Sequence, residues 1–325
     1  MHSKKRVFIV GGTGFLGYHT IQEFLKHGWE ATALGLPPAP PVDLYSSGVK
    51  VILRDLDIAT DQELLDLLGG HEALIFAAGL DDRFPQKKPA YPKFFHANVE
   101  VPRRVLRLAK QAGIKHAVVF GSYFSHFNRL WPELRLADRH PYIRSRVEQE
   151  QAVTSIPDLD VDVLELPYIF GRLPVRGWKS LWAPLVKYLR AIPFVFYMKG
   201  GTACISANMV GKAAFGAITL GHANTCYPIG QENLSWSEML IRLAAADERH
   251  IHVITIPNWL LKVGLIFFWL FHELQGREGG LDPRHFAPLQ TAETFLDPET
   301  SKRLLGYDTD DLDDAFQKTI QACKE

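Results

Sequence analysis

A short stretch near the start of the chain, Gly11-Gly12-Thr13-Gly14-Phe15-Leu16-Gly17, has the composition of a phosphate-binding turn. At this spacing, Gly11 permits a tight turn, Gly14 lets the backbone approach a pyrophosphate, and Gly17 lets a helix pack closely on a strand. Backbone N–H groups and the positive end of a helix dipole would then hold the phosphates. The alternative interpretation is a glycine-rich turn without a ligand.

The residues on either side predict the strand and the helix that this chemistry requires. Val7 to Val10 is an unbroken apolar run of β-forming residues, which is typical of a strand buried on both faces. A helical pattern follows the glycines as far as Lys26, and Gly28 stands where that helix would end. Because strand, turn and helix come in this order, the sequence favours a turn that binds a dinucleotide.

Further apolar runs alternate with helical patterns along the first half of the chain. Strands are predicted at 30–35, 49–53, 73–79, 117–120 and 161–166, and helices at 62–68, 98–112 and 142–153. This alternation predicts an α/β fold with a doubly wound parallel sheet, the Rossmann arrangement, and right-handed crossovers. Ligands of such sheets lie beyond the carboxyl ends of the strands. The residues predicted at that edge are Gly11, Asp55, Ala78, Ser122 and Pro167.

The end of the second predicted strand, at Gly35, bears on the choice of dinucleotide. An acidic residue there would bind the ribose 2′-hydroxyl and repel a 2′-phosphate, but the first carboxylate after the strand is Asp43. We therefore expect NADP in preference to NAD, although no arginine follows to bind the phosphate; alternatively, Gly35 is only a turn residue. The small residues Ala77, Ala78 and Gly79 would allow a cofactor to approach the fourth strand.

The composition argues against several classes of function. Thirty-six basic and thirty-six acidic residues cancel, so the overall charge indicates neither a nucleic-acid partner nor attraction to an anionic membrane surface. Cys204, Cys226 and Cys323 are too few and too widely spaced for a disulfide framework or a metal cluster. We expect no bound metal and, since no signal peptide precedes the first strand, a reduced cytoplasmic setting.

After Gly171 the alternation of strands and helices breaks down. We therefore expect a dinucleotide-binding domain at 1–170 and a smaller, mostly helical substrate lobe at 171–325, interleaved with the first around 203–230. The most apolar stretch, 259–271, would span roughly 20 Å as a helix, less than the roughly 30 Å of a hydrocarbon core. A transmembrane helix is not expected. A buried or lid helix is favoured, and the alternative is a helix that docks on a surface beside a lipophilic substrate.

Several segments resemble the extended short-chain dehydrogenase/reductases, the NAD(P)-dependent epimerase, dehydratase and reductase group. The glycine turn has that family's spacing, and the C-terminal half resembles its dihydroflavonol-reductase-like members. Further matching segments are Asp55-Leu56, Asn98-Val99, Pro141-Tyr142-Ile143-Arg144-Ser145-Arg146, Pro167 to Gly171 and Ser301 to Tyr307. The cofactor-binding residues implied by this resemblance are Gly11, Thr13, Gly14, Phe15, Leu16, Gly17, Gly35, Asp55, Leu56, Ala77, Ala78, Gly79, Asn98, Pro167 and Ile169.

The resemblance also implies the catalytic residues. Tyr142 would be the acid/base, and Ser122 or Tyr123 would hold the substrate oxygen. Arg146 stands where the family has a catalytic lysine. A cation about 4 Å from a phenol contributes about 4 kcal/mol at an effective dielectric of about 20, enough to bring a phenol pKa near neutrality. Arginine cannot release a proton, so this residue cannot relay a proton as the family's lysine amine can. The activity is therefore expected to be attenuated. Asn98 would be either a helix N-cap or a residue nearer the chemistry, and Asp55 either a cofactor contact or a turn residue.

Together these implications predict an NAD(P)-dependent oxidoreductase acting on a carbonyl or hydroxyl group of a small, partly apolar molecule. Arg172 and Arg176 keep open a sugar-nucleotide epimerase or dehydratase. A third interpretation is a catalytically impaired dinucleotide-binding sensor or subunit. Family members often pair through the helices that begin here near Asn98 and Tyr142, so either a monomer or a homodimer is expected.

Overall fold

A computed structural model describes residues 4–324 of the chain. Its centre is a seven-stranded sheet in the order β11-β7-β6-β4-β1-β2-β3, in which all neighbouring strands are parallel. The predicted doubly wound α/β fold is confirmed, with the strand order reversing beside β1. The strands are β1 (Arg6–Val10), β2 (Glu30–Gly35), β3 (Val49–Leu53), β4 (Ala73–Phe76), β6 (His116–Phe120), β7 (Asp160–Glu165) and β11 (Cys226–Pro228).

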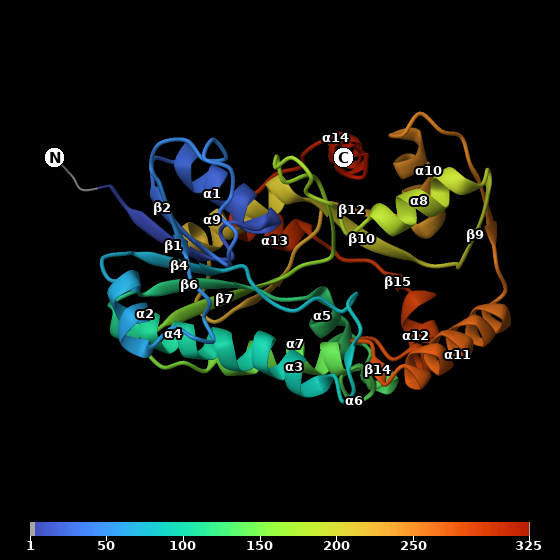
Figure 1. Cartoon of the computed structure of the whole chain (residues 1–325), viewed down its shortest axis with the longest axis horizontal. Helices are drawn as coiled ribbons and strands as arrows, with labels where there is room; N and C mark the ends of the chain where they lie inside the picture. Colours follow the sequence, from blue (N-terminus) through green and yellow to red (C-terminus); the bar gives the residue numbers. More distant parts are fainter. Residues whose placement is uncertain (1–3, 325) are drawn as a thin grey trace.

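Helices cover both faces of this sheet (Figure 1). The side chains of β1 alternate between two cores: Val7 and Ile9 pack on the α1 and α9 side, and Phe8 and Val10 pack on the opposite side. Burial on both faces is the reason why the strand is apolar without interruption. One face carries α1 (Phe15–Lys26), α9 (Ala207–Leu220) and α13 (Glu299–Leu305), and the other carries α2 (Asp61–Leu68), α4 (Val101–Gln111) and α7 (Pro141–Thr154).

Two elements of the lobe that contains the seven-stranded sheet, the first lobe, come from the second half of the chain. Helix α9 packs beside α1 through Val210 and Ala214, and the edge strand β11 pairs with β7. Strand β11 is only three residues long and contains Pro228, so neither its length nor its composition predicted a strand.

The second lobe is built around a small sheet of β8 (Tyr168–Phe170), β10 (Gly201–Ser206), β12 (Glu232–Ser235) and β15 (Glu293–Thr294). Helices α8 (Ala183–Ala191), α10 (Trp236–Ala245) and α14 (Leu312–Ala322) surround a core that contains Phe170, Trp236 and Phe316. The sequence predicted helices here but not this sheet, because its strands have only two to six residues and pair with segments distant in the chain.

The helix expected from Asn98 begins earlier. Helical backbone starts in α3 (Tyr91–Phe95), passes through a π-helical turn at His96–Glu100 and continues into α4. Asn98 lies inside the π-helical turn and is fully buried. The interpretation of Asn98 as a helix N-cap is therefore wrong.

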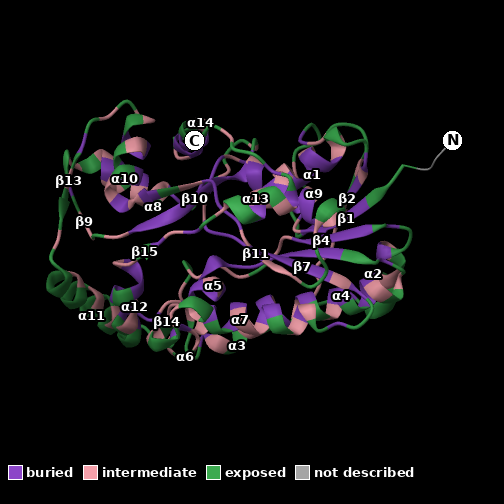
Figure 2. Ribbon diagram, turned by 180° about the vertical axis from the view of Figure 1, so that it is seen from behind, coloured by how far each residue is buried: buried purple, intermediate pink, exposed green. Residues whose placement is uncertain are grey.

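Helix α11 (Asn258–Leu274) contains the most apolar stretch of the sequence. The expectation of a buried helix is wrong, because His272 is the one buried residue along it and most of its apolar residues are exposed, as the colouring of α11 in Figure 2 shows. Across residues 4–324, no helix has both the length and the apolar character needed to cross a membrane.

Candidate active site

The glycine turn joins β1 to α1 with the geometry that its sequence predicted. Gly11 has a φ of +77°, which favours glycine. A Cβ on Gly17 would lie 2.2 Å from the Gly11 carbonyl oxygen, so only glycine lets α1 pack this closely on the turn. Gly14 is the N-cap of α1 and provides no side-chain cap. The first N–H groups of α1 are therefore available to an external acceptor.

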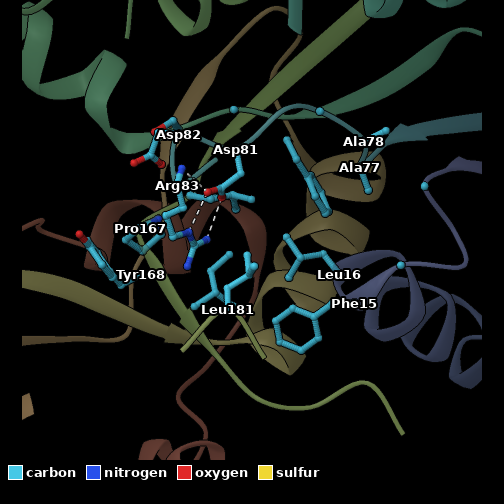
Figure 3. A pocket seen from close by; sticks show the side chains of 18 of the residues that line it. Phe15, Leu16, Ala77, Ala78, Asp81, Asp82, Arg83, Pro167, Tyr168 and Leu181 are labelled. Carbon is cyan, nitrogen blue, oxygen red and sulfur yellow. Dashed lines mark hydrogen bonds and ion pairs between the residues drawn. The ribbon is translucent and has the colours of Figure 1, made fainter. Parts of the chain in front are cut away.

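A cavity of about 500 Å³ opens at the carboxyl ends of the strands, in front of this turn. Its volume is within the range usual for ligand sites. Phe15 and Leu16 lie on one side of it, and Asp82, Arg83 and Tyr168 lie on the other (Figure 3). The sequence-predicted residues that line it are Gly11, Gly14, Phe15, Leu16, Ala77, Ala78, Gly79, Ser122, Tyr123, Tyr142, Arg146, Pro167 and Ile169.

Tyr142, the second residue of α7, lines this cavity. Its backbone N–H donates to the Gly280 carbonyl at 2.9 Å, and its ring makes edge contacts with Phe94 and Phe124. Burial raises the pKa of Tyr142 above its usual value, and the charge of Arg146 and a hydrogen bond with Ser122 offset that rise only in part. The expectation that Arg146 brings this pKa toward neutrality is thus not met by the chain's own residues: the phenol is protonated at neutral pH.

Arg146 is a buried cation whose hydrogen bonds are incomplete. Its Nη1 donates to the Phe120 carbonyl at 3.2 Å and to Gln149 Oε1 at 3.0 Å, while its Nε has no partner. Within the described residues, no carboxylate lies at ion-pair distance from it. The guanidinium centre lies 5.1 Å from the centre of the Tyr142 ring. A Cβ on Gly79 would lie 3.1 Å from Arg146 Nη2, so this glycine makes room for the cation.

Ser122 and Tyr123 are oriented differently, although both line the cavity. Ser122 is the N-cap of α5 (Tyr123–Leu130) and interacts with the Tyr142 phenol. The Tyr123 hydroxyl points into the second lobe, where it lies 2.9 Å from Thr202 Oγ1 and 3.4 Å from Thr294 Oγ1. Of the two candidates for holding a substrate oxygen, only Ser122 has its hydroxyl beside Tyr142.

The other sequence-predicted residues do not line the cavity. Thr13 packs against Gly35, where a Cβ would lie 1.9 Å from Thr13 Oγ1. Asp55 accepts a hydrogen bond from the Asp57 backbone N–H at 2.9 Å, as a turn residue does. Asn98 holds the end of the β4 loop, since its Oδ1 accepts from the Leu80 N–H at 2.8 Å. Four further residues also fall outside the cavity lining: Gly17, Leu56, Arg172 and Arg176.

Sequence reasoning missed Arg54, which lies beside the end of β2. Strands β2 and β3 pair in parallel, so that Leu53 lies beside Gly35, and the Arg54 N–H donates to the Gly35 carbonyl at 2.9 Å. The Arg54 guanidinium contacts Glu63 at 2.6 Å in an exposed pair. Because parallel strands end at the same edge of a sheet, a search for arginine after the third strand, and not only after the second, would have found Arg54.

Sequence reasoning also missed an acidic and basic cluster on the loop after β4. Arg83 binds both carboxylate oxygens of Asp81 at 2.7 Å (Figure 3). Asp82 has no such partner among residues 4–324, and its burial, together with the charge of Asp81, raises the pKa of Asp82 to about 7. The cavity therefore contains a carboxyl group that changes its charge near neutral pH.

The raised pKa of Asp82 gives a prediction for stability. An unfolded aspartate has a pKa of about 3.9, so the folded protein binds this proton more tightly. Stability should therefore fall as pH rises from about 4 to about 7, where the folded group ionises. The full shift corresponds to about 4 kcal/mol, and solvent screening reduces it because Asp82 is only half-buried. In Asp82→Asn we therefore expect a flatter profile and a gain of about 2 kcal/mol near pH 8, measured by urea denaturation. The exposed Asp43→Asn should leave the profile unchanged; a matching change there would contradict the prediction.

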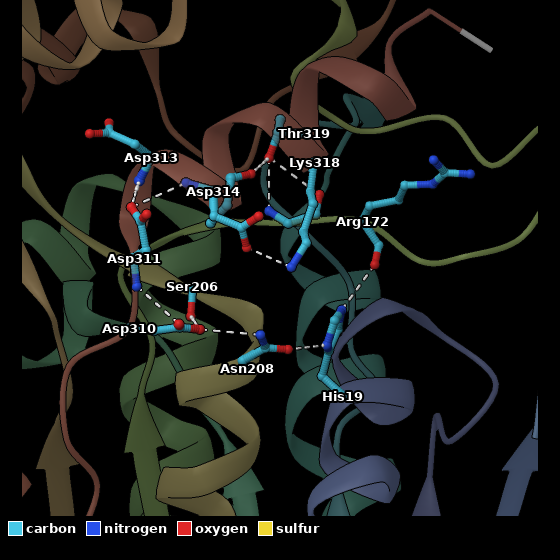
Figure 4. Close-up of polar contacts among 12 residues, drawn as sticks. His19, Arg172, Ser206, Asn208, Asp310, Asp311, Asp313, Asp314, Lys318 and Thr319 are labelled. Carbon is cyan, nitrogen blue, oxygen red and sulfur yellow. Dashed lines mark hydrogen bonds and ion pairs between the residues drawn. The ribbon is translucent and has the colours of Figure 1, made fainter. Parts of the chain in front are cut away.

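Polar contacts fix the segment after β8 onto α1 and α14 (Figure 4). The His19 ring of α1 contacts Asn208 Oδ1 at 2.8 Å and the Arg172 carbonyl at 2.9 Å. The Thr319 hydroxyl of α14 accepts from the Gly171 N–H at 2.8 Å. Residues 166–182 pass from one lobe to the other and supply part of the lining of the cavity. These bonds therefore fix the position of one lobe relative to the other at the cavity.

The sequence profile of the NAD dependent epimerase/dehydratase family matches residues 7–174, slightly more than half of the chain. The chain belongs to this family. A protein of Synechocystis sp. that carries the provisional name dihydroflavonol 4-reductase is 21% identical over 334 residues, which cover 96% of this chain and 93% of that protein.

Solved structures share the fold of this epimerase/dehydratase family member over nearly the whole chain. The crystal structure of gox2253 has a TM-score of 0.78 at 18% identity and covers 99% of this chain and 98% of that one. A nucleoside-diphosphate-sugar epimerase from Pseudomonas aeruginosa has a TM-score of 0.71 at 15% identity, with the same coverage of 99% and 98%. A UDP-glucuronic acid 4-epimerase from Bacillus cereus, solved with UDP-glucuronic acid and NAD, has 0.69 at 13% identity, covering 98% and 99%.

The residues of the cavity fit the nicotinamide dinucleotide on which this family depends. The uncapped start of α1 offers N–H donors to phosphate oxygens. A Cβ on Gly14 would meet only the Gly11 carbonyl oxygen, at 3.2 Å, so the glycine leaves open space that the fold itself does not fill. The unpartnered Nε of Arg146 shows that this cation is not satisfied by the protein alone.

Proposed function

We propose that this chain is an NADP-dependent oxidoreductase that interconverts a carbonyl and a hydroxyl group on a small, partly apolar molecule. The observation that carries the proposal is the presence of Tyr142, Ser122 and Arg146 in one cavity with the glycine turn. When bound, the nicotinamide would supply or accept the hydride. The residues of the chain would bind the substrate oxygen and move its proton.

Tyr142 is suited to donate a proton. Because burial raises the pKa of its phenol, the group carries its proton at neutral pH and can transfer it to the oxygen of a carbonyl as that oxygen gains negative charge. Ser122, beside the phenol, would donate a second hydrogen bond to the same oxygen. Arg146 would stabilise the phenolate that remains, without exchanging a proton itself. This assignment favours reduction of a carbonyl at neutral pH.

The lining of the cavity supports a partly apolar substrate. The segment after β8 contributes Trp178, Leu181 and Trp182 to the lining. The ring of Trp178 packs against Phe15, the ring of Trp182 packs against Tyr168, and Phe124 lies beside Tyr142. Arg172 and Arg176, the residues that favoured a sugar nucleotide, are not part of this lining. Apolar and aromatic walls with a few polar groups are typical of sites for small organic ligands.

Arg54 provides a prediction for the choice between NADP and NAD. Its exposed pair with Glu63 contributes little to stability, so the guanidinium is free to turn to a 2′-phosphate beside Gly35. In Arg54→Ala we expect affinity for NADPH to fall about tenfold and affinity for NADH to stay within about twofold. Fluorescence titration with both cofactors measures this. Arg103→Ala, which removes an exposed arginine of α4, is the control, and equal losses of NADPH and NADH would contradict the assignment.

The proposed reaction is tested with purified protein in two steps. Thermal denaturation with NADPH and with NADH should give a rise in midpoint that is larger for NADPH. A panel of aromatic and aliphatic aldehydes and ketones should then give oxidation of NADPH, followed by its absorbance. A cofactor-dependent rise without turnover on any carbonyl would instead favour a dinucleotide-binding sensor, and turnover only with sugar nucleotides would favour an epimerase or dehydratase.

A further inference from the structure

Helix α11 presents an unusually large apolar surface to solvent. Nine of the twenty-one exposed large hydrophobic side chains in the described residues lie on this one helix. Each of the nine is at least 41% exposed, and Leu274 reaches 88%. Contiguous apolar surface of this kind marks a binding surface, because water covers it at a cost in free energy. The nine are Trp259, Leu260, Val263, Ile266, Phe267, Phe268, Leu270, Phe271 and Leu274.

The apolar surface continues onto the adjacent pair of strands, β9 (Phe194–Tyr197) and β13 (His252–Thr255). Phe194 and Phe196 are each 54% exposed, while Val195 between them is buried, so the two phenylalanines share the outer face. Ile254 pairs with Phe196 and is also exposed. Figure 2 shows β9, β13 and α11 together along one end of the molecule. We call this surface, the nine side chains of α11 with Phe194, Phe196 and Ile254, the apolar end.

The distribution of side chains around α11 indicates what covers it. The less exposed residues, Leu261, Leu265, Trp269 and His272, form one narrow stripe that faces the protein. At 3.6 residues per turn, the nine exposed residues spread over roughly 200° of the circumference. A helix that packs against protein needs an apolar stripe of about 100°. A flat contact with a second copy of the chain would therefore leave many of the nine exposed side chains in water. Fluid lipid chains could contact all of them.

The charges around the apolar end complement a lipid surface. Between Lys262 and Glu273 the helix has no aspartate, glutamate, lysine or arginine. Glu273 is neutralised by Lys88 at 2.6 Å. Lys262 and Arg277, near the two ends of α11, have no acidic partner within the described residues, and cations at this position bind the phosphates of lipid headgroups. Trp259 at the start of the helix suits the same interface.

We propose that the apolar end docks the protein on the surface of a phospholipid bilayer, with α11 lying in the interfacial plane. The 17-residue helix is insufficient to cross the bilayer as it stands, so it lies along the surface. Docking follows from apolar burial, with the headgroup contacts of Lys262 and Arg277 adding to it. This proposal is independent of the proposed reaction.

The test is flotation of the full chain with phosphatidylcholine vesicles. We expect the protein to float with the vesicles in high salt as well as in low salt, because apolar burial is not screened. In the triple variant Trp259→Ser, Phe267→Ser, Phe271→Ser, the bound fraction should fall at least about tenfold. The control variant Val42→Ser, Ile58→Ser, Leu220→Ser removes three exposed apolar side chains elsewhere and should bind as the wild type does. Thermal denaturation verifies that both variants fold.

A second measurement reports contact with lipid directly. Brominated phosphatidylcholine should quench tryptophan fluorescence in the wild type, and Trp259→Phe should lose part of this quenching while still floating. Failure of the wild type to float overturns the proposal, as does equal binding by the two triple variants. A dimer in sedimentation equilibrium that the α11 variant abolishes, without any vesicle binding, would show that a second copy covers the apolar end instead.

Discussion

Tyr142→Phe should lower kcat for carbonyl reduction by about 10³-fold, because it removes the hydroxyl that we assign as proton donor. The ring remains, and with it the contacts to Phe94 and Phe124, so the fold should persist. The hydroxyl does not form part of the glycine turn, and we expect affinity for NADPH to stay within about twofold. Steady-state kinetics by NADPH absorbance, together with a cofactor titration, measure both quantities.

The matched control is Tyr123→Phe, the same chemical change at the first residue of α5. The Tyr123 hydroxyl is bonded to Thr202 and Thr294 in the second lobe, so its loss should cost about 1 kcal/mol of stability and leave kcat within a few-fold. If Tyr142→Phe kept more than a tenth of the wild-type turnover, the assignment of Tyr142 as the acid would fail. A large loss of kcat in Tyr123→Phe, with none in Tyr142→Phe, would identify Tyr123 as the acid instead.

Gly17→Ala should be the most destabilising of the simple substitutions in the glycine turn. The added Cβ would lie 2.2 Å from the Gly11 carbonyl oxygen and 2.7 Å from Gly12 Cα. Both are backbone atoms, so α1 would have to move away from β1. We expect a loss of about 3 kcal/mol or more in the free energy of unfolding, measured by urea denaturation.

Two other glycines separate packing from binding. Gly264 lies in α11 with no atom within 4 Å of an added Cβ, so Gly264→Ala should raise stability by about 0.5–1 kcal/mol through helix propensity. Gly14→Ala should leave stability within about 1 kcal/mol, since its Cβ meets one atom at 3.2 Å, and should abolish the thermal shift by NADPH. If Gly17→Ala were as stable as Gly14→Ala, the close packing of α1 on the turn would be contradicted.

The first lobe could be predicted from the sequence because its signals are local. The strand at Val7–Val10 is apolar throughout since it is buried on both faces, and the glycine turn and the helical pattern of α1 follow it directly in the sequence. The boundaries of β2 and β3 are as predicted. Strand β11 could not be found in this way, because its three residues gain their structure from pairing with β7.

Tertiary structure determined the features of the site that local patterns could not give. The orientation of Tyr123 depends on Thr202 and Thr294, which are distant in the chain. The proximity of Arg54 to Gly35 depends on the register of two strands. The rise in the pKa of Tyr142 depends on burial, which a sequence does not state. For α11 the apolar composition was visible, but whether protein covers it depends on the whole fold.

The replacement of an amine by a guanidinium beside the Tyr142 ring has a consequence for alkaline solution. A lysine ammonium in such surroundings would lose its charge as the medium became more basic, whereas arginine keeps its charge at every pH that a protein survives. The contribution of Arg146 to the electric field on the phenol is thus constant on the alkaline limb of a titration. No inflection in activity there would arise from the loss of the charge on Arg146.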